Sequence, residues 1–585
     1  MEHHKYIEVY MNNLKLFLVL VFIIYSQNSV FAQISFTESS VSQNVNVSHG
    51  TSAFVGGISF FDFNNDGWDD LTFASQDGDP IYFYQNNNGT LNPISLNLVD
   101  NLNDTRQINW VDIDNDGDND LFVVSNNASN KLYLNDGSMN FTDITVSSGI
   151  STGIMQSWGS SWGDINNDGY LDLFLSNRDI ANGLQPNLLY KNNGNNTFTD
   201  VSNSAGISNS NHLSFCASFF DFNNDGWQDI YIANDRFTTS NILYKNNRNG
   251  TFTDVSVSSG ANIIMDAMST TIDDYDHDGD LDIYITNTSS GNYFLKNNGD
   301  ETFTNVAPTN GTLFESVAWG AVFLDADNDS NLDLYVSGMR DGTNGQLPSA
   351  FYENQGNETF IIPNGAGFAN DIAESYSNAI GDINNDGLPD ISVLNKEPDN
   401  NFLWMNTNTD GNNWLKVTLE GVTSNRMGIG SWIEISLNGN KQYRYTLNGE
   451  GYTSQNSGAE FFGLGNSATI DYVKVTWLSG VEDILYNVSV NQKLHIVESS
   501  TLSVSENELA DNVVVYPNPS KGQVVVNTSL ENYKINIYNV LGSNVFSKFD
   551  LVNNANLDLR HLERGIYFIK ITSLNKEIVK RLIVN

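Results

Sequence analysis

An aspartate-rich motif of nine residues, D-x-[DN]-x-D-G-x-x-D, occurs seven times in the chain, with serine in place of glycine in the sixth copy. Successive copies begin 50, 52, 57, 53, 51 and 57 residues apart. A period this regular predicts a repeat architecture in which each unit carries one such loop. The copies are numbered loops 1 to 7 and begin at Asp62, Asp112, Asp164, Asp221, Asp274, Asp325 and Asp382.

Each loop has the residue types that bind a hard cation. In loop 1, Asp62, Asn64 and Asp66 supply side-chain oxygens at positions 1, 3 and 5, Trp68 offers its backbone carbonyl at position 7, and Asp70 completes the set at position 9. Glycine at position 6 permits the sharp turn. The equivalent predicted ligands are Asp112, Asp114, Asp116, Asp118 and Asp120 (loop 2); Asp164, Asn166, Asp168, Tyr170 and Asp172 (loop 3); Asp221, Asn223, Asp225, Trp227 and Asp229 (loop 4); Asp274, Asp276, Asp278, Asp280 and Asp282 (loop 5); Asp325, Asp327, Asp329, Asn331 and Asp333 (loop 6); and Asp382, Asn384, Asp386, Leu388 and Asp390 (loop 7).

These oxygen-only sets favour Ca²⁺ over Zn²⁺ or Mg²⁺, with up to seven ions in a mainly structural role. The loops share the first half of an EF-hand loop but lack its glutamate at position 12 and its flanking helices, so an EF-hand pair is rejected. Ser330 replaces the glycine of loop 6. A non-glycine residue at positive φ costs about 1 kcal/mol or more, so the sequence leaves the occupancy of loop 6 open.

Around each loop, four short strands are predicted in about 50 residues, which is typical of a propeller blade. ASFFDF, DIYIAN, NILYKN and TFTDVS are the four strands around loop 4. The seventh unit lacks its fourth strand, and a spare copy, ISFTES, begins at Ile34. We expect this N-terminal copy to pair into the seventh unit and close the ring, which removes an exposed sheet edge.

Composition limits the partners and the cellular compartment. The formal net charge is −42, with 40% apolar and 12% aromatic residues, so the chain is expected to be folded and to repel nucleic acid. Residues 1–32 are predicted to be a signal peptide, with the apolar run Leu16–Tyr25 too short to span a bilayer, and no transmembrane segment is expected in the mature chain. Cys216 is the only cysteine, so no intrachain disulfide is possible, and it is interpreted as a small buried apolar residue.

The loops and their strands resemble the FG-GAP/VCBS repeat family over roughly residues 33 to 408. The resemblance implies a seven-bladed β-propeller with calcium at the blade loops, here assigned to residues 33–410. The predicted fold class is all-β: a seven-bladed calcium-binding β-propeller, then a small β-sandwich or barrel, and a C-terminal β-sandwich sorting domain.

The second module is predicted over residues 411–499, where alternating strands are separated by glycine turns. NWLKVTLEG, NRMGIGSWIEI, GEGYTSQNS, FFGLGN and VKVTWLSG are similar to the ASPIC/UnbV module found in cartilage acidic protein-like chains. Gly428 and Gly430 are interpreted as turn glycines in preference to a ligand cradle. Gln455 and Asn456 are likewise expected to be polar turn residues.

Residues 500–512 are predicted to be a polar linker, and the third module follows at 513–585. YPNP, LERGIY and the basic KEIVKR tail resemble the type A sorting domain of the type IX secretion system. This resemblance implies recognition by that secretion machinery, passage across the outer membrane, and an extracellular or surface-attached product.

Catalytic signatures are weak. The seven histidines include no HExxH motif, and His277, at position 4 of loop 5, is expected to point to solvent. The G-x-S-x-G string at 159–163 lies on a predicted strand and not in the strand–turn–helix of a nucleophile elbow. Trp110, Trp158, Trp162 and Trp319 are expected to pack in the blades in preference to stacking on sugars.

These observations favour a secreted or cell-surface protein that binds an extracellular glycan or protein ligand and is not an enzyme. The alternative is a calcium-dependent glycan-active enzyme such as a polysaccharide lyase, which needs a cluster of Lys, Arg, Tyr or His in a cleft. The sequence names neither the ligand nor the propeller face that binds it.

Overall fold

The computed structural model describes residues 34–99, 101–180, 183, 185–210, 212–363, 368, 371–501, 513–528, 530–539, 543–562, 564–573 and 576–585. The predicted signal peptide lies outside these residues, as does residue range 502–512 of the predicted linker. The chain divides into two compact units, one ending at Ser500 and the other beginning at Thr501. Within the described ranges, every helix is too short or too polar to cross a membrane.

The first unit begins with seven antiparallel four-stranded sheets, the blades of the predicted propeller. Each acidic loop joins the first strand of its blade to the second. The strands are β2 (Ile58–Phe61), β3 (Asp70–Phe73), β4 (Tyr82–Asn86) and β5 (Leu91–Ile94) in blade 1; β6 (Thr105–Val111), β7 (Asp120–Ser125), β8 (Lys131–Asn135) and β9 (Phe141–Asp143) in blade 2; β10 (Ser157–Gly163), β11 (Asp172–Asn177), β12 (Leu188–Asn192) and β13 (Phe198–Asp200) in blade 3; and β14 (Ser214–Phe220), β15 (Asp229–Asn234), β16 (Ile242–Asn246) and β17 (Phe252–Asp254) in blade 4. Blade 5 contains β18 (Thr271–Asp273), β19 (Asp282–Ile285), β20 (Tyr293–Asn297) and β21 (Phe303–Asn305); blade 6 contains β22 (Ala318–Leu324), β23 (Asp333–Gly338), β24 (Ala350–Asn354) and β25 (Phe360–Ile361); and blade 7 contains β26 (Ser375–Gly381), β27 (Asp390–Asn395) and β28 (Phe402–Asn406).

The N-terminal strand closes the ring, as the sequence predicts. Strand β1 (Phe36–Glu38) pairs antiparallel with β28, with Phe36 opposite Asn406, and supplies the fourth strand of blade 7. The first strands of blades 1 and 7, β2 and β26, also lie side by side. Phe36 is buried and contacts the rings of Phe351 and Phe368. The first described strand therefore joins two parts of the chain that are far apart in sequence.

Four one-turn helices follow the fourth strands of blades 2 to 5. Each ends at a glycine with φ between +76° and +94°, the left-handed conformation that glycine adopts without a Cβ clash. They are α2 (Thr145–Ser148), α3 (Ser202–Ala205), α4 (Ser256–Ser259) and α5 (Ala307–Asn310).

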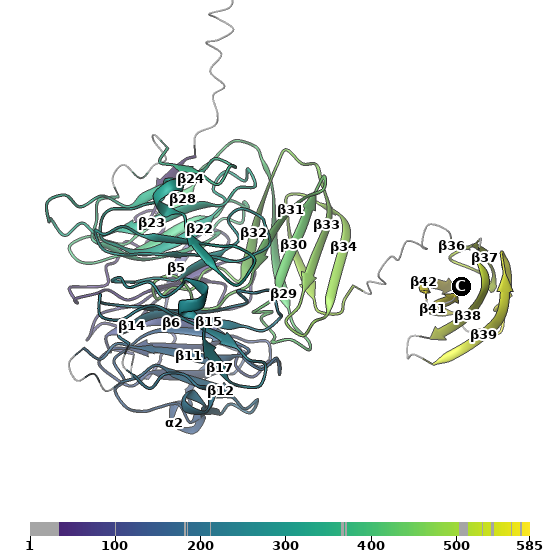
Figure 1. Ribbon diagram of the computed structural model, residues 1–585, viewed down its shortest axis with the longest axis horizontal. Coiled ribbons are helices and arrows are strands. Elements are labelled where there is room, and N and C mark those ends of the chain that lie inside the picture. Colours follow the sequence, from purple (N-terminus) through teal and green to yellow (C-terminus); the bar gives the residue numbers. More distant parts are fainter. Residues whose placement is uncertain are drawn as a thin grey trace, which may run out of the picture. The chain divides into compact units, whose positions relative to one another are not determined.

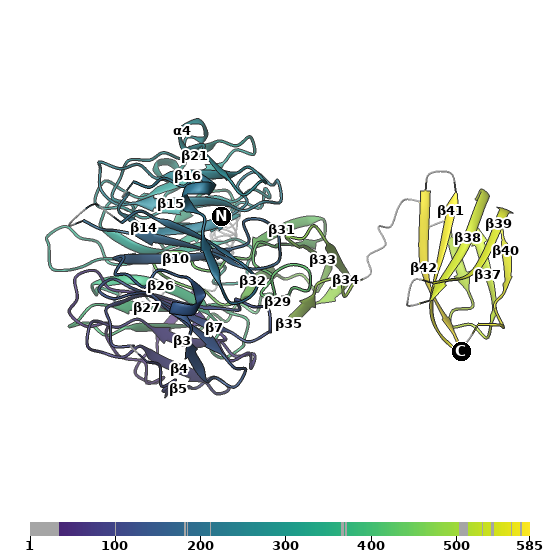
Figure 2. The same cartoon turned by 90° about the horizontal axis from the view of Figure 1, so that it is seen from below.

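The second module is a β-sandwich, within the sandwich-or-barrel prediction. Its sheets have the orders β32-β29-β35 and β31-β30-β33-β34, and β29 pairs parallel with β35. Val417, Ile433, Phe462 and Val475 lie in the core between the sheets. In both views the green strands of this sandwich lie beside the blades (Figures 1 and 2). Its strands are β29 (Asn413–Glu420), β30 (Trp432–Leu437), β31 (Asn440–Tyr445), β32 (Ala459–Gly465), β33 (Thr469–Thr476), β34 (Glu482–Ser489) and β35 (Gln492–Val497).

The connection from β31 to β32, residues 446–458, enters the propeller and is called the plug. At its tip Tyr452 is fully buried and contacts the rings of Phe215, Trp319 and Tyr376, which come from the first strands of blades 4, 6 and 7. The Tyr452 hydroxyl donates to the carbonyl of Val55 at 3.2 Å. The plug thus fills the space between the first strands of the blades.

Two plug residues correct the sequence interpretation. The backbone of Gln455 pairs with β2: its N–H donates to the carbonyl of Ile58 and its carbonyl accepts from the N–H of Phe60, both at 2.9 Å. Its side chain bonds both the N–H and the carbonyl of Trp110. Asn456 Oδ1 accepts from the N–H of Ile380 at 3.0 Å. Both were predicted to be polar turn residues, and that prediction is wrong, because the buried blade backbone needs these partners.

The second unit is a β-sandwich of its own, with the sheets β36-β37-β40 and β39-β38-β41-β42. Val526, Ile535, Ile569 and Leu582 are buried in its core. Its strands are β36 (Val513–Tyr516), β37 (Gln523–Thr528), β38 (Glu531–Asn539), β39 (Asn544–Val552), β40 (Ala555–Asp558), β41 (Gly565–Ser573) and β42 (Lys576–Val584).

Removing the closing strand should destabilise the whole ring. We expect Phe36→Ala to lower the free energy of unfolding by about 3 kcal/mol, because it removes a buried aromatic side chain. Thr37→Ala on the same strand is the matched control, since Thr37 is exposed. Deleting Ile34–Ser39 should have a larger effect than either substitution. Thermal unfolding checks this, and equal melting temperatures for wild type and the deletion would contradict the closure role.

Candidate metal centres on the propeller loops

Each loop is organised by hydrogen bonds from its own backbone. In loop 1, Asp62 accepts from the N–H groups of Asp66 at 3.0 Å and Gly67 at 2.7 Å, and Asp66 accepts from the N–H of Trp68 at 3.0 Å. Corresponding bonds from position 6 to position 1 and from position 7 to position 5 occur in all seven loops, at 2.7 to 3.2 Å. The backbone therefore turns the carboxylates of positions 1 and 5 into the loop.

The aspartate at position 9 begins the second strand of each blade and is buried in all seven. Asp70 accepts from the N–H of Phe63 at 3.1 Å and from the N–H of Asn86, the last residue of β4, at 2.7 Å. The asparagine that ends the third strand makes the same backbone bond in every blade, at 2.7 to 2.9 Å. This hydrogen bond fixes the position-9 carboxylate relative to the rest of the loop.

Position 4 links neighbouring blades, a role that the sequence analysis missed. Its residue has φ between +53° and +63° in all seven loops, and its side chain bonds the carbonyl of position 6 in the next loop at 2.6 to 3.2 Å. The bond from Asn385 to Gly67 closes the circle between loops 7 and 1. Asparagine at position 4 in six of seven loops was the signal in the sequence, since asparagine tolerates the left-handed conformation.

His277 occupies position 4 of loop 5, and its predicted orientation toward solvent is wrong. Its Nε2 lies 2.6 Å from the carbonyl oxygen of Ser330 in loop 6. Because a carbonyl only accepts, Nε2 carries the proton. Burial, together with the nearby Arg444 charge, lowers the pKa of His277 to about 4, which keeps the ring neutral. Histidine therefore takes the bridging role that asparagine has elsewhere.

The loops bring carboxylates together in the manner that a cation site requires. One oxygen each from Asp112, Asp114 and Asp120 lies within 4.8 Å of the other two, and the same holds for Asp274, Asp276 and Asp282 and for Asp325, Asp327 and Asp329. In loops 1, 3, 4 and 7 position 3 is asparagine, and its Nδ2 donates to the position-5 carboxylate at 2.8 to 3.1 Å.

Several of these oxygens are buried without a protein partner. Among the described residues, Oδ1 of Asp112, Asp114, Asn166 and Asn223 has no hydrogen-bond donor. An unsatisfied buried oxygen is costly, and several facing one another in a single loop are the expected environment of a bound cation. The residues present therefore fit a hard divalent ion.

Burial also makes these carboxylates hard to ionise when no cation is present. It raises the pKa of Asp70 and of Asp120 to about 8, and that of Asp112 to about 7. Neighbouring carboxylates of the same loops act in the same direction. A bound divalent cation would favour the ionised forms and displace the protons.

Loop 6 has the strain that its sequence predicts. Ser330 has φ +88° where the other loops have glycine. Its hydroxyl donates to the carbonyl of Gly463 in the sandwich at 3.0 Å. This contact gives the strained residue a partner that a glycine would not have.

The sandwich of β29–β35 covers part of the loop face. Lys493 Nζ donates to the Gly67 carbonyl at 3.2 Å, and the N–H of Arg426 donates to Asn115 Oδ1 at 2.8 Å. Lys416 is buried, with its ammonium 3.1 Å from Asp69 and 3.5 Å from Asp382 Oδ2. These contacts could not be predicted from the sequence, because they join a repeated surface to a module that is not repeated.

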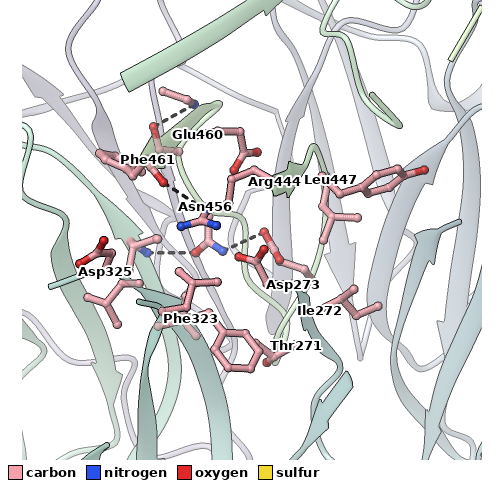
Figure 3. A pocket seen from close by; sticks show the side chains of 18 residues that line it. Thr271, Ile272, Asp273, Phe323, Asp325, Arg444, Leu447, Asn456, Glu460 and Phe461 are labelled. Carbon is pink, nitrogen blue, oxygen red and sulfur yellow. Dashed lines mark hydrogen bonds between the residues drawn. The ribbon is translucent and has the colours of Figure 1, made fainter. Parts of the chain in front are cut away.

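Two cavities lie between the propeller and the sandwich with its plug. The larger, about 550 Å³, is lined by loops 1 and 2 and by Glu420, Arg426, Lys493 and His495 of the sandwich. In the smaller, about 50 Å³, Asp273, Glu460 and Arg444 lie around the same space, as Figure 3 shows. Burial raises the pKa of Asp273 to about 6 and that of Glu450, which also lines this cavity, to about 7.

The remaining sequence candidates lie in structural positions. Trp110, Trp158, Trp162 and Trp319 are all buried: Trp110 and Trp162 pack among the blade strands, as predicted, whereas Trp158 and Trp319 lie in the cluster around Tyr452 of the plug. The G-x-S-x-G string forms β10, and Cys216 is buried beside the plug, with Sγ 3.4 Å from the N–H of Thr453. Gly428 and Gly430 have φ of +70° and +87°, as predicted for turn glycines.

Comparison with family models identifies the modules. An FG-GAP-like repeat model matches residues 62–123, 112–175, 221–285 and 274–336, an ASPIC and UnbV model matches 421–503, and a secretion system C-terminal sorting domain model matches 514–585. This chain carries FG-GAP-like repeats, an ASPIC and UnbV domain and a type IX sorting domain. The sorting domain indicates export across the outer membrane to the cell surface or the extracellular space.

Cartilage acidic protein 1 of Mus musculus and of Homo sapiens is 29% identical to this chain over 233 and 235 residues. Each match covers 38% of this chain and 34% of the relative, so the chain spans about a third of the length of these curated relatives.

Two solved structures align with 91% of the chain at low similarity. The extracellular domain of a hybrid two-component system of B. thetaiotaomicron has a TM-score of 0.37, 12% identity and 71% of its own chain covered. PorZ, a surface component of the type IX secretion system of Porphyromonas gingivalis, has a TM-score of 0.20, 10% identity and 81% covered.

The raised pKa values predict how stability depends on pH without a cation. Asp70 and Asp120 have a pKa of about 8 in the folded chain and near 4 when unfolded. Their contribution to stability is therefore fully present below about pH 4 and is lost as the pH rises through about 8. In a chelator, we expect a lower melting temperature at about pH 8 than at about pH 5.

Calcium should reduce or reverse this trend, because it competes best with protons at high pH. Thermal unfolding across the pH range, with chelator and with calcium, measures both curves. A chelated protein whose melting temperature rises between these pH values would contradict the assignment of the loops.

Proposed function

We propose that this chain is an exported calcium-binding propeller that acts as a binding or adhesion module for an extracellular glycan or protein, and not as an enzyme. The observation that carries the calcium assignment is the set of buried, unpartnered oxygens on Asp112, Asp114, Asn166 and Asn223. Their ligand types and spacing suit Ca²⁺, whose sites in extracellular modules have a Kd of roughly 0.1 to 1 mM.

Calcium in these loops would act mainly as a structural staple. At about 1 mM calcium, a site with a Kd of about 0.1 mM stabilises the folded state by about 1.4 kcal/mol. Seven such sites would contribute about 10 kcal/mol, comparable to the stability of a whole domain. The position-4 bonds between adjacent loops would spread the effect of each ion to the next blade.

The cavity over loops 1 and 2 supports a binding role. Its volume of about 550 Å³ lies in the range of small-molecule sites. It is lined by neutral Asn448, acidic Glu460 and basic Lys493, with apolar Met427 and Leu447 beside them. This mixture suits a polar, hydroxyl-rich ligand such as one or two sugar units.

One observation favours the enzymatic alternative. Arg426, Lys493 and His495 line the same cavity, and His495 Nε2 lies 2.9 Å from Glu420 Oε2. A basic cluster next to a histidine is the arrangement that a polysaccharide lyase uses to neutralise a uronate and remove a proton. Binding with turnover would make this second candidate the better one.

Calcium titration and ligand screening together test the proposal. Calcium added to the chelated mature chain should raise its melting temperature by about 10 °C, given about 10 kcal/mol spread over a unit of this size. The calcium-loaded chain is then screened on glycan and surface-protein arrays, with soluble products analysed. No rise in melting temperature would contradict the calcium assignment.

A matched pair of variants locates the ligand. Lys493→Met should weaken binding at least tenfold if the cavity over loops 1 and 2 is used. Lys441→Met is the control, because Lys441 lies on β31 outside that cavity and is half-exposed. Equal affinity for both variants would exclude this cavity, and any cleaved glycan would favour the lyase alternative.

A further inference from the structure

In every blade but the second, the turn after the third strand is bonded to the acidic loop of the preceding blade. The asparagine that ends the third strand donates through Nδ2 to the position-2 carbonyl of that loop, as Asn192 does to Ile113 at 2.8 Å and Asn406 does to Ala326 at 2.8 Å. The residue four positions after this asparagine therefore lies beside the neighbouring loop.

Three blades show what this fourth residue does. Glu301 accepts from Asn223, position 3 of loop 4, at 3.3 Å. Lys296 joins Glu358 to Asp276, position 3 of loop 5. Asn196 lies close enough to Asp114, position 3 of loop 2, to interact with its carboxylate. In these three blades the fourth residue, directly or through a lysine, interacts with position 3 of the loop before it.

In blade 7 this fourth residue is Asp410, which lies on the segment that leads from β28 into β29. The segment is attached to loop 6, because Asn412 Nδ2 donates to the backbone carbonyl of Asp327 at 2.9 Å. The carboxylate of Asp410 is close enough to those of Asp327 and Asp329 to repel both electrostatically. Asp410 thus adds a further carboxylate to a loop that already contains four.

Asp410 differs from the acids in the equivalent turns. Glu301 is paired with Lys245 at 2.5 Å and Glu358 with Lys296 at 2.9 Å. In the part of the chain that the structure describes, Asp410 has no lysine or arginine partner, and its Oδ1 is buried without a donor, as is Oδ1 of Asn408. These two unsatisfied oxygens lie beside loop 6, and a bound cation is the partner that would satisfy them.

We propose that Asp410, from outside the loop, is a ligand of the cation in loop 6, with Asn408 beside it. The ion would then connect blade 6 to the segment that begins the ASPIC and UnbV domain. This inference rests on the proposed calcium binding by the loops. It also explains how loop 6 tolerates Ser330, since an additional carboxylate ligand offsets the backbone strain at φ +88°.

Calcium binding to the chelated mature chain tests the proposal, with Asp410→Ala compared to Asp300→Ala. Asp300 is the matched control, because it is an exposed acid in the equivalent turn of blade 5 and its carboxylate accepts from Thr302. By chelator competition, we expect Asp410→Ala to weaken one site at least tenfold, or to remove one bound calcium, and Asp300→Ala to match wild type. Asp410→Asn should give a smaller loss.

Melting temperatures separate a ligand from a structural residue. Without calcium, Asp410→Ala should melt at or above the wild-type temperature, because it removes repulsion from Asp327 and Asp329. With calcium, it should melt below wild type. An equal loss under both conditions, or unchanged calcium affinities, would overturn the role of Asp410, whereas a wild-type chain that binds no calcium would overturn the proposed function itself.

Discussion

Repulsion among carboxylates held close together is the constraint on which the propeller depends. Backbone N–H groups turn the aspartates of positions 1 and 5 inward, and the third-strand asparagine holds position 9 from behind. Several of the resulting oxygens face one another without a proton donor. The fold can accept this arrangement in only two ways, by protonation or by a cation. With 69 acidic against 27 basic residues, the chain cannot supply enough lysines and arginines to neutralise the loops from within.

The same loops also hold the blades together. The position-4 side chain connects each loop to the next through a hydrogen bond to the position-6 carbonyl. The ring is closed twice more, by β1 in blade 7 and by the plug, whose Gln455 extends the backbone pairing of β2. A propeller without disulfides therefore relies on strand closure, a central plug and the hydrogen bonds between its loops for the restraint that sulfur provides in other exported proteins.

Much of this arrangement could be predicted because repeats make equivalent positions visible. The seven loops, the four-stranded blades, the closing strand at Ile34 and the strain at Ser330 all followed from comparing one repeat with another. The contacts of the ASPIC and UnbV domain could not be predicted in this way, because that domain occurs once. In the sequence Gln455 and Asn456 look like ordinary turn residues, and only the structure shows that they hydrogen-bond the backbone of the blades. His277 was misread for a related reason: the role of position 4 lies in the next blade, and spacing along one repeat does not reveal it.

The single sandwich also removes the equivalence of the seven loops. Loop 1 contacts Lys493, and loop 7 contacts the buried ammonium of Lys416. Loop 6 contacts Gly463 through Ser330 and also contacts the segment that contains Asp410. Sites that are nearly identical in sequence therefore have different charges around them, and their affinities for a cation must differ. The cavities lie where the unrepeated domain packs against the ring of repeated loops. A specific binding site is for that reason more readily formed between the propeller and the sandwich than on the blades themselves.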